Sequence, residues 1–345
     1  MMIFKNILQE GFVLESKGYY KKATEVFYKA LELDNSSVEL LFEIAKLYYL
    51  MQNEEKSLDY IEQVLDRDPT HVETLKLLKQ IFVDRNAFEQ AEQTAKNIYC
   101  ISKNTKDLIE IFKLLNKQKK YNEIFEYNVE NPSSEVYVEK TRALFCQKNF
   151  EEAEILVKKA LELEPESAEA LLLLGQIFYA KGNKESCVEI AKKIKVGEKN
   201  PELLNFLGLI KSYLNEDAEE YFKKAIRLNR ENHQYYYNLA NFYLKNNRMA
   251  LAKKYYNLAI SIEPENQNYH FAIANLYYLE KHYKKALEEL SSDSFEAKLL
   301  RAVILYETGY LALSRKELID IMKEKPQHKV AEEYLQKINL ELGLK

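Results

Sequence analysis

The feature that most constrains this chain is a small residue that returns at intervals of about 34 positions. We call this set the second-helix column; it runs, for example, from Ala218 to Ala252 and on to Ala286. About twelve positions before each member stands another residue, usually small, in what we call the first-helix column. The second-helix column contains Ala23, Ser57, Ala91, Ala153, Cys187, Ala218, Ala252, Ala286 and Ser314, and the first-helix column contains Gly11, Ala45, Lys79, Thr141, Gly175, Gly208, Ala240, Ala274 and Ala302.

Two such columns indicate pairs of antiparallel helices, because helices approach closely only where their facing side chains are small. Around the columns the apolar residues follow helical spacing, as Leu171, Leu174 and Phe178 do. Pro165 and Pro264 follow second helices and stop them, since proline cannot continue the hydrogen-bond ladder. The chain has only 8 glycines and 6 prolines, which suits long helices joined by short loops. Left-handed turns are expected within the pairs at Gly18, Asn53, Gly182, Asn247 and Gly309.

This pattern resembles the tetratricopeptide repeat (TPR) family. The 34-residue period, the small columns, the final proline and an aromatic residue at Tyr48, Phe178, Tyr243 and Tyr277 are that family's signature. The resemblance implies an all-α fold, a right-handed α-solenoid of about ten TPR helix-turn-helix units between Phe4 and His328. Such units are repeated because one helix pair cannot bury its apolar faces alone. Residues 329–345 are predicted to form a C-terminal capping helix that closes the exposed apolar edge.

Three units depart from the pattern, and the first of them suggests a domain organisation. Residues 106–133 form an irregular short unit, residues 202–232 lose two positions near Asn215, and the unit that begins at Gln267 stops early at Ser294. We predict an N-terminal TPR block of three units over residues 4–105 and a C-terminal block of six units over residues 134–328. The irregular unit between them is either a bend or an ordinary unit that stacks with a slightly different twist.

No motif in the chain indicates catalysis, so we predict no catalytic, cofactor-binding or metal-binding residue and no enzymatic activity. Glycine-rich phosphate-binding loops do not occur, and the five histidines lack metal-ligand spacing. His270 and Cys187 stand at positions where the repeat needs packing residues, and we interpret them as such.

Charge and cysteine content limit the compartment and the class of partner. The formal net charge is -4 and no basic block occurs, which argues against a nucleic-acid partner. Cys100, Cys146 and Cys187 are odd in number and far apart, which favours a reducing compartment. The sequence lacks a signal-like leader and an apolar run that could insert into a membrane, so we expect a cytoplasmic protein. The oligomeric state stays open.

The family resemblance also implies a concave groove, lined by the first helices, in which partners usually lie. On each first helix, the positions three before, one after and four after the first-helix column share one face. This face mixes aromatic, aliphatic and amide side chains and has few charges. The predicted partner-binding residues are Asn238, Asn241, Asn275, Tyr237, Phe271, Tyr278, Gln176, Tyr179, Arg142 and Tyr306.

Two patterns of the family can be compared with this face. The clamp for acidic C-terminal tails needs lysine, asparagine and arginine over three consecutive units, and no three units here supply them. An asparagine ladder like that of O-linked GlcNAc transferase is partly present, since residues 238–241 read Asn-Leu-Ala-Asn and residues 273–275 read Ile-Ala-Asn. Its use is that one carboxamide can both donate to and accept from a peptide backbone. The alternative, that these are ordinary polar surface residues, stays open.

The sequence therefore predicts a protein-protein interaction scaffold that binds an extended or helical segment of a partner protein. The alternative is an assembly or chaperone-like factor for an envelope, secretion or other multiprotein complex. The C-terminal half is expected to dominate affinity, because its face offers amides and aromatic rings. The N-terminal half carries charges there instead, at Lys46, Lys76 and Arg142.

Overall fold

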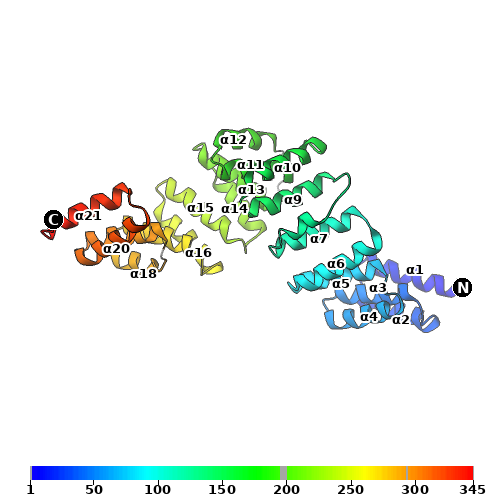
Figure 1. The fold of residues 1–345 in the computed structure, drawn as a ribbon. Helices are drawn as coiled ribbons and strands as arrows, with labels where there is room; N and C mark the ends of the chain where they lie inside the picture. The colour runs from blue at the N-terminus through cyan, green and yellow to red at the C-terminus, as the bar shows by residue number, and fades with distance from the viewer. Residues whose placement is uncertain (1, 195–199, 293, 345) are drawn as a thin grey trace. The chain divides into compact units, whose positions relative to one another are not determined.

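The computed structural model describes residues 2–194, 200–292 and 294–344, and helices joined by short turns make up this described part (Figure 1). None of these residues lies in a strand, so the all-α prediction is confirmed. The chain divides into two compact units, Met1–Ser186 (unit 1) and Cys187–Lys345 (unit 2).

In unit 1, first and second helices alternate, and each second helix contacts the first helices before and after it. The first helices are α1 (Met2–Ser16), α3 (Val38–Leu50), α5 (Val72–Asp84), α7 (Thr105–Lys117), α9 (Ser134–Cys146) and α11 (Ala168–Ala180). The second helices are α2 (Tyr20–Leu33), α4 (Glu54–Arg67), α6 (Phe88–Ser102), α8 (Glu123–Glu126) and α10 (Phe150–Leu163). Helix α12 (Lys184–Lys193) spans the division between the units.

Unit 2 follows the same alternation and ends with the predicted capping helix. Its first helices are α13 (Pro201–Tyr213), α15 (His233–Lys245), α17 (Gln267–Leu279) and α19 (Phe295–Glu307). Its second helices are α14 (Glu219–Leu228), α16 (Met249–Ile262), α18 (Tyr283–Glu289) and α20 (Leu311–Glu324). Helix α21 (Lys329–Glu341) packs on α20 and buries Ala331 and Ile338, while its Leu340 is 83% exposed. The consecutive helix pairs and the final helix confirm the predicted α-solenoid.

The helices of each pair approach most closely at the two columns. Every member of the second-helix column is fully buried. Two of its serines bond directly to the first-helix column: the Ser57 hydroxyl donates to the Ala45 carbonyl at 2.9 Å, and the Ser314 hydroxyl donates to the Ala302 carbonyl at 2.7 Å. A buried hydroxyl must find an acceptor, and here the facing backbone supplies it.

At Gly11 and Gly208 of the first-helix column, the partner helix places a large ring against the glycine. A Cβ atom built on Gly208 would lie 2.8 Å from Cε1 of Phe222, and one on Gly11 would collide with the ring of Phe27. Both rings are fully buried, so they have no room to move aside. The missing Cβ is therefore what lets each ring fill the space between its two helices.

The turn within each pair uses one left-handed residue, and the structure corrects one of the predicted positions. Gly18 and Gly309 have the expected positive φ, but Asn53 does not. The left-handed residue there is Gln52 (φ 58), while Asn53 caps α4 by accepting from the backbone N–H of Lys56. The register was off by one because asparagine suits both a left-handed turn and an N-cap. Gly182 and Asn247 also have positive φ, as predicted.

A further column, absent from our sequence predictions, begins the first helices. In each helix from α3 to α21 that opens a pair or caps the array, a side chain accepts a backbone N–H of the first turn, as Ser167 does from Ala170. Such caps satisfy donors that the helix itself leaves unpaired. The capping residues are Ser37, His71, Asn104, Ser133, Ser167, Asn200, Asn232, Asn266, Ser294 and His328.

Two second helices are much shorter than the others. Helix α8 has 4 residues and α18 has 7, against 14 residues in α10, α16 and α20. Both lie in units that the sequence marked as irregular. The predicted blocks, residues 4–105, 106–133 and 134–328, stay predictions.

The close approach at Gly208 generates a stability prediction. Gly208→Leu forces a side chain against the buried ring of Phe222, and we expect a loss of about 1–3 kcal/mol from overpacking. Adding Phe222→Ala makes room for the new side chain and should recover part of the loss. The measurement is the urea unfolding midpoint, and an unchanged midpoint in the single variant would show that these helices do not meet here.

Candidate functional site

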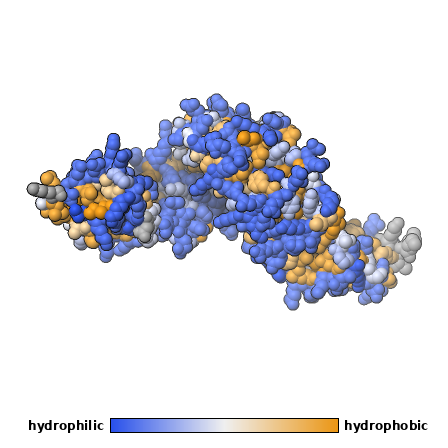
Figure 2. Space-filling view, viewed as in Figure 1, coloured by the Kyte–Doolittle hydropathy of each residue, from blue (hydrophilic) through white to orange (hydrophobic). Residues whose placement is uncertain are grey.

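The side chains predicted to bind a partner in unit 2 come from α15, α17 and α19. On the face of the molecule drawn in Figure 2, hydrophilic residues cover most of the surface and apolar residues gather in separate patches. We call the following set the first-helix face of unit 2: Tyr237, Asn241, Phe271, Asn275, Tyr278 and Tyr306.

Tyr237 and Asn241 are held together by a residue of the paired helix, Tyr256 on α16. The Tyr256 ring is 1% exposed, and its hydroxyl donates to Oδ1 of the exposed Asn241. The ring of half-buried Tyr237 lies 5.6 Å from the Tyr256 ring and 4.8 Å from that of Tyr269 on α17. Burial raises the pKa of the Tyr256 hydroxyl, so it stays a donor. The carboxamide of Asn241 is thus oriented with its oxygen toward the protein.

Phe271 and Tyr278 pack on one cluster at the pairing of α17 with α18. Both rings are half-buried against a core that contains Ala274 and Ala286. Asn275, which stands between them in the sequence, is half-buried, and within the part of the chain that the structure describes its side chain makes no hydrogen bond. This helix therefore presents two partly covered rings and an unused amide.

Tyr306 belongs to a third cluster, formed with α21. Its hydroxyl donates to a Glu341 carboxylate oxygen at 2.6 Å, and its ring meets that of Tyr334 edge-on at 5.3 Å. The Glu341 hydrogen bond, with burial, raises the pKa of the Tyr306 hydroxyl. The hydroxyl of Tyr306 is thus engaged in attaching the capping helix.

Asn238, although predicted to bind a partner, does not lie on the open face. It is 7% exposed, its Nδ2 donates to Oδ1 of Asn205 on α13 at 2.9 Å, and its Oδ1 accepts from Nε2 of Gln234 at 3.1 Å. One end of the carboxamide therefore links α15 to the neighbouring first helix α13, and the other end is used within α15. Position and burial make Asn238 a brace of the stack.

The same bracing continues onto α17 through residues that the sequence predictions missed. The Tyr269 hydroxyl lies 3.3 Å from Oε1 of Gln234 and 2.5 Å from Nδ1 of His233. Burial first, then Tyr237 and Glu263, raise the pKa of Tyr269 to about 12. No spacing within one helix reveals this link, because its members stand 35 and 36 residues apart.

The three predicted residues in unit 1 have different surroundings. Arg142 on α9 lies 3.7 Å from Glu139 and 3.8 Å from Glu169, measured between charged atoms. Gln176 is half-buried on α11, and Tyr179, one turn further along, is 47% exposed. Tyr179 is thus the more accessible of the two α11 residues.

The charges of the unit 1 face are largely compensated within the chain. Lys46 pairs with Glu15 at 3.0 Å and with Glu43, and Lys76 pairs with Glu73 at 2.9 Å. Partly exposed pairs of this kind contribute little to stability, but they leave no large uncompensated field for a ligand.

His270 and Cys187 pack as expected, and both ring nitrogens of His270 also contact oxygen atoms. Its Nδ1 lies 2.7 Å from a Glu289 carboxylate oxygen and its Nε2 lies 2.8 Å from the Pro264 carbonyl oxygen. Both partners are acceptors, so both ring nitrogens must be protonated. Partial burial lowers the pKa of His270, but the bonds to Glu289 and Pro264 outweigh it and raise the pKa above its usual value. Burial raises the pKa of the fully buried Cys187 thiol.

Within the described residues, no group of three or more histidine, cysteine, aspartate or glutamate side chains could hold a metal ion. In the same residues, no helix combines the length and the apolar character needed to cross a membrane.

Comparison with known families agrees with the repeat seen in the helices. Residues 6–37, 38–71 and 233–266 each match a tetratricopeptide repeat model, and residues 144–210 match a second model with the same description. The chain belongs to the tetratricopeptide repeat family. Proteins of this family are typically non-enzymatic scaffolds, and membership supports a general role in protein interaction.

One curated protein with the same kind of repeat is similar to part of this chain. The TPR repeat-containing protein MJ1428 of Methanocaldococcus jannaschii is 25% identical over 249 residues, which is 63% of this chain and 43% of that relative. The chain thus spans less than half the length of the curated relative that it matches.

Two solved structures share the tetratricopeptide fold. The APC/C hetero-tetramer Cut9–Hcn1 matches with a TM-score of 0.63 and 14% identity, over 96% of this chain and 75% of that one. PilF of Pseudomonas aeruginosa matches with a TM-score of 0.50 and 19% identity, over 63% of this chain and 99% of that one. At these identities the likeness shows the fold alone.

The bracing role of Asn238 predicts a loss of stability when it is replaced. Asn238→Leu leaves the Asn205 oxygen and the Gln234 amide without their partner, and we expect a cost of about 1–3 kcal/mol. Asn241→Asp, which keeps an acceptor for Tyr256, should stay within about 0.5 kcal/mol of wild type. Urea unfolding measures both, and equal midpoints for the two variants would contradict the brace.

The charged state of His270 predicts a pH dependence. Its folded pKa is raised, so its contribution is fully present below the unfolded pKa, near 6.5, and is lost as pH rises through the higher folded pKa. Wild type should therefore exceed His270→Gln in unfolding midpoint at pH 5.5–6 by more than at pH 8.5. A constant difference across this range would mean that the imidazolium is not the stabilising form.

Proposed function

We propose that this tetratricopeptide repeat protein is a non-enzymatic scaffold whose first-helix face of unit 2 binds an extended or helical segment of a partner protein. The observation that carries the proposal is the orientation of Asn241. Its oxygen accepts from the buried Tyr256 hydroxyl, so its amide N–H groups are directed away from that bond. A fixed, exposed donor of this kind suits a main-chain carbonyl of a bound peptide.

Asn275 offers the same chemistry one repeat later. It stands 34 residues after Asn241, at the same position relative to the first-helix column. Because its amide is not used by other described residues, it can both donate and accept. Two carboxamides at equivalent positions of neighbouring units favour an extended segment, whose backbone groups are free to pair.

Aromatic rings beside the amides supply the apolar part of the binding energy. Phe271 and Tyr278 rest on a packed cluster and are only half covered, so a partner side chain could bury the rest of each ring. Such rings lose little conformational entropy on binding, because packing already restricts them. Unit 1 carries more internally compensated charge on its first helices, so unit 2 is the favoured half.

The remaining inferences concern compartment and partner class. We place the protein in the cytoplasm, because Cys100 and Cys146 are exposed and free, which suits a reducing environment. The nearly balanced charge, 50 basic against 54 acidic residues, supports a protein partner and not a nucleic acid.

The test first identifies a partner through the face itself. A photo-crosslinking amino acid replaces Tyr278 and, in a matched control, the 60% exposed Tyr310 at the start of α20. A protein captured at Tyr278 and not at Tyr310 supplies the partner segment, which is then synthesised for affinity measurements.

The decisive comparison uses two variants with the same change in charge. Asn241→Asp with Asn275→Asp keeps the acceptor for Tyr256 and removes both amide donors, so affinity should fall at least about tenfold. Asn247→Asp with Asn257→Asp makes the same change at exposed positions of a turn and a second helix, and should leave affinity unchanged. If the two double variants bind equally, or if Lys46→Ala with Lys76→Ala abolishes binding instead, the site is not on this face.

A further inference from the structure

Helix α18 stops halfway along the path of a second helix. It begins three residues before Ala286, as α16 begins three before Ala252, but it ends at Glu289 after 7 residues instead of 14. The chain then turns away and enters α19 at Phe295. The last two turns of this second helix, about 10 Å of helix, are therefore missing from the stack.

In a full-length second helix those two turns cover the following first helix. In the first unit, Ala30 from the end of α2 packs in one cluster with Ile44 and Tyr48 of α3. By position in the repeat, the residues of α19 that correspond to Ile44 and Tyr48 are Arg301 and Leu305. The surface that α2 covers on α3 thus has no covering helix on α19.

The uncovered surface forms a cleft of about 670 Å³ between α19 and α20. Leu305 and Leu313 are its apolar residues, and Leu313 is 54% exposed. Charged side chains of the two helices make up the rest of the lining. The volume and the apolar floor fit a short helix laid where the end of α18 would be.

Arg301 is a charged residue at a position that is apolar after longer second helices. The residue just before the first-helix column is a buried aliphatic side chain at Ile44, Leu239 and Ile273, each of which follows a longer second helix. It is a cation after the two shortest second helices, Lys140 after α8 and Arg301 after α18. Each cation donates to a carbonyl beyond the truncated helix: Lys140 to Tyr127 at 3.3 Å, and Arg301 to Leu290 at 3.0 Å and to Ser292 at 3.4 Å.

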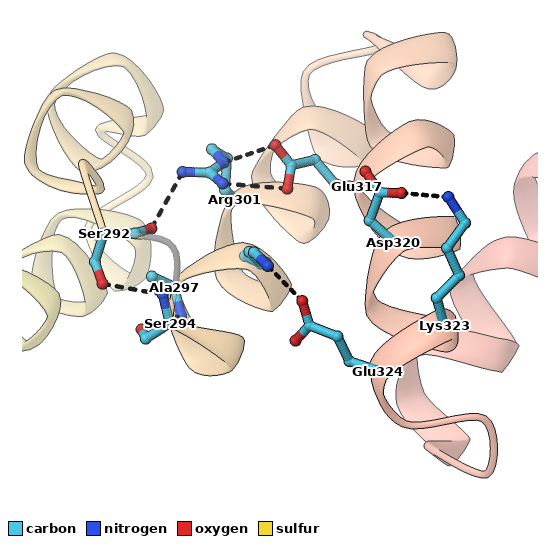
Figure 3. Close-up of polar contacts among 9 residues, drawn as sticks. Ser292, Ser294, Ala297, Arg301, Glu317, Asp320, Lys323 and Glu324 are labelled. Atoms are coloured by element: carbon cyan, nitrogen blue, oxygen red, sulfur yellow. Dashed lines mark hydrogen bonds and ion pairs between the residues drawn. The ribbon is translucent and has the colours of Figure 1, made fainter.

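Arg301 is also fixed to the other wall of the cleft, as Figure 3 shows. Its guanidinium binds the Glu317 carboxylate of α20 through two bonds, at 2.9 and 3.2 Å. The side chain is 20% exposed and lies between the end of α18 and α20. It therefore holds the cleft walls at a set separation and leaves Leu313 uncovered.

The charges of the cleft indicate what its occupant carries. Four cations and three carboxylates line it, and each carboxylate pairs with one cation. The remaining cation, exposed Lys316, has no carboxylate within ion-pair distance in the described parts of the chain. An acidic residue on the occupant would complete the set. The pairs are Lys298 with Glu324, Arg301 with Glu317 and Lys323 with Asp320.

We propose that this cleft binds a two-turn amphipathic helix of a partner protein, with small and aliphatic residues against Leu305 and Leu313 and an acidic residue near Lys316. The chain's own repeat shows the kind of sequence that fits. Helices α2 and α10 both end in Lys-Ala-Leu-Glu-Leu, and in both the alanine is fully buried. This site is separate from the first-helix face of unit 2 and does not depend on it.

The probe is a peptide with the sequence of residues 157–164, Val-Lys-Lys-Ala-Leu-Glu-Leu-Glu, held helical by a side-chain crosslink because so short a helix is unstable in water. Binding to the full chain is measured by fluorescence anisotropy. Leu313→Glu should weaken binding at least about tenfold. The matched control is Leu163→Glu on α10, where the leucine is 55% exposed and off the cleft, and it should bind as wild type does.

Charge exchange tests the contact between Lys316 and an acidic residue of the bound helix. Lys316→Glu should weaken the peptide about two- to fivefold, as expected for an exposed pair, and a peptide with lysines in place of its two glutamates should recover that loss. Asn241→Asp with Asn275→Asp should not change the affinity, which keeps this test independent of the proposed function.

Three results would overturn the proposal. The first is no binding up to about 1 mM peptide, where even a weak complex would form. The second is peptide binding that Asn241→Asp with Asn275→Asp weakens and Leu313→Glu does not, which would place the peptide on the first-helix face. The third is dimerisation of the wild type that Leu313→Glu abolishes, which would mean that a second copy of the chain occupies the cleft.

Discussion

Everything in this fold depends on the close approach of two helices at one pair of columns. The buried small residues let the backbones meet, and the Ser57 and Ser314 hydroxyls show how near they come, since each reaches a carbonyl of the facing helix. Once a pair is fixed in this way, its outer faces remain apolar and must be covered by the next pair. Stacking, and the surfaces that stacking leaves open, both follow from that single contact.

The shortened second helices show what happens when the cover is incomplete. At α19 a full second helix would bury an aliphatic side chain, but Arg301 occupies that position and satisfies carbonyls that α18 no longer pairs. Lys140 does the same beyond α8, with Tyr127. A cation is suited to this task because its long stem packs against apolar surface while its end donates hydrogen bonds. The exchange keeps the array folded and leaves apolar surface such as Leu313 uncovered.

The sequence predicted the helix pairs, the columns and the short units. A regular period, and a departure from that period, can both be read from a single sequence. It did not predict the N-cap column, because serine, asparagine and histidine can each cap a helix and no single residue type recurs at that position. It placed Asn238 and Asn241 in one set, although the structure buries the first and exposes the second. The difference arises from Asn205, which lies 33 residues before Asn238 and accepts from it. Contacts between units, unlike those within one helix, leave no local spacing to read.

The contrast between these two asparagines also explains how a rigid stack of helices can present an oriented hydrogen-bond donor at its surface. Asn238 joins α15 to α13 through its amide donor, while its oxygen accepts from Gln234 on the same helix. The Tyr269 hydroxyl bonds Gln234 and extends the bracing to α17. The first helices are thereby held in register before any ligand arrives. Asn241, three residues later, uses only its side-chain oxygen, which accepts a hydrogen bond from the Tyr256 hydroxyl. A donor that is already oriented loses little entropy on binding, so under the proposed function the bracing by Asn238 would raise the affinity that Asn241 can contribute.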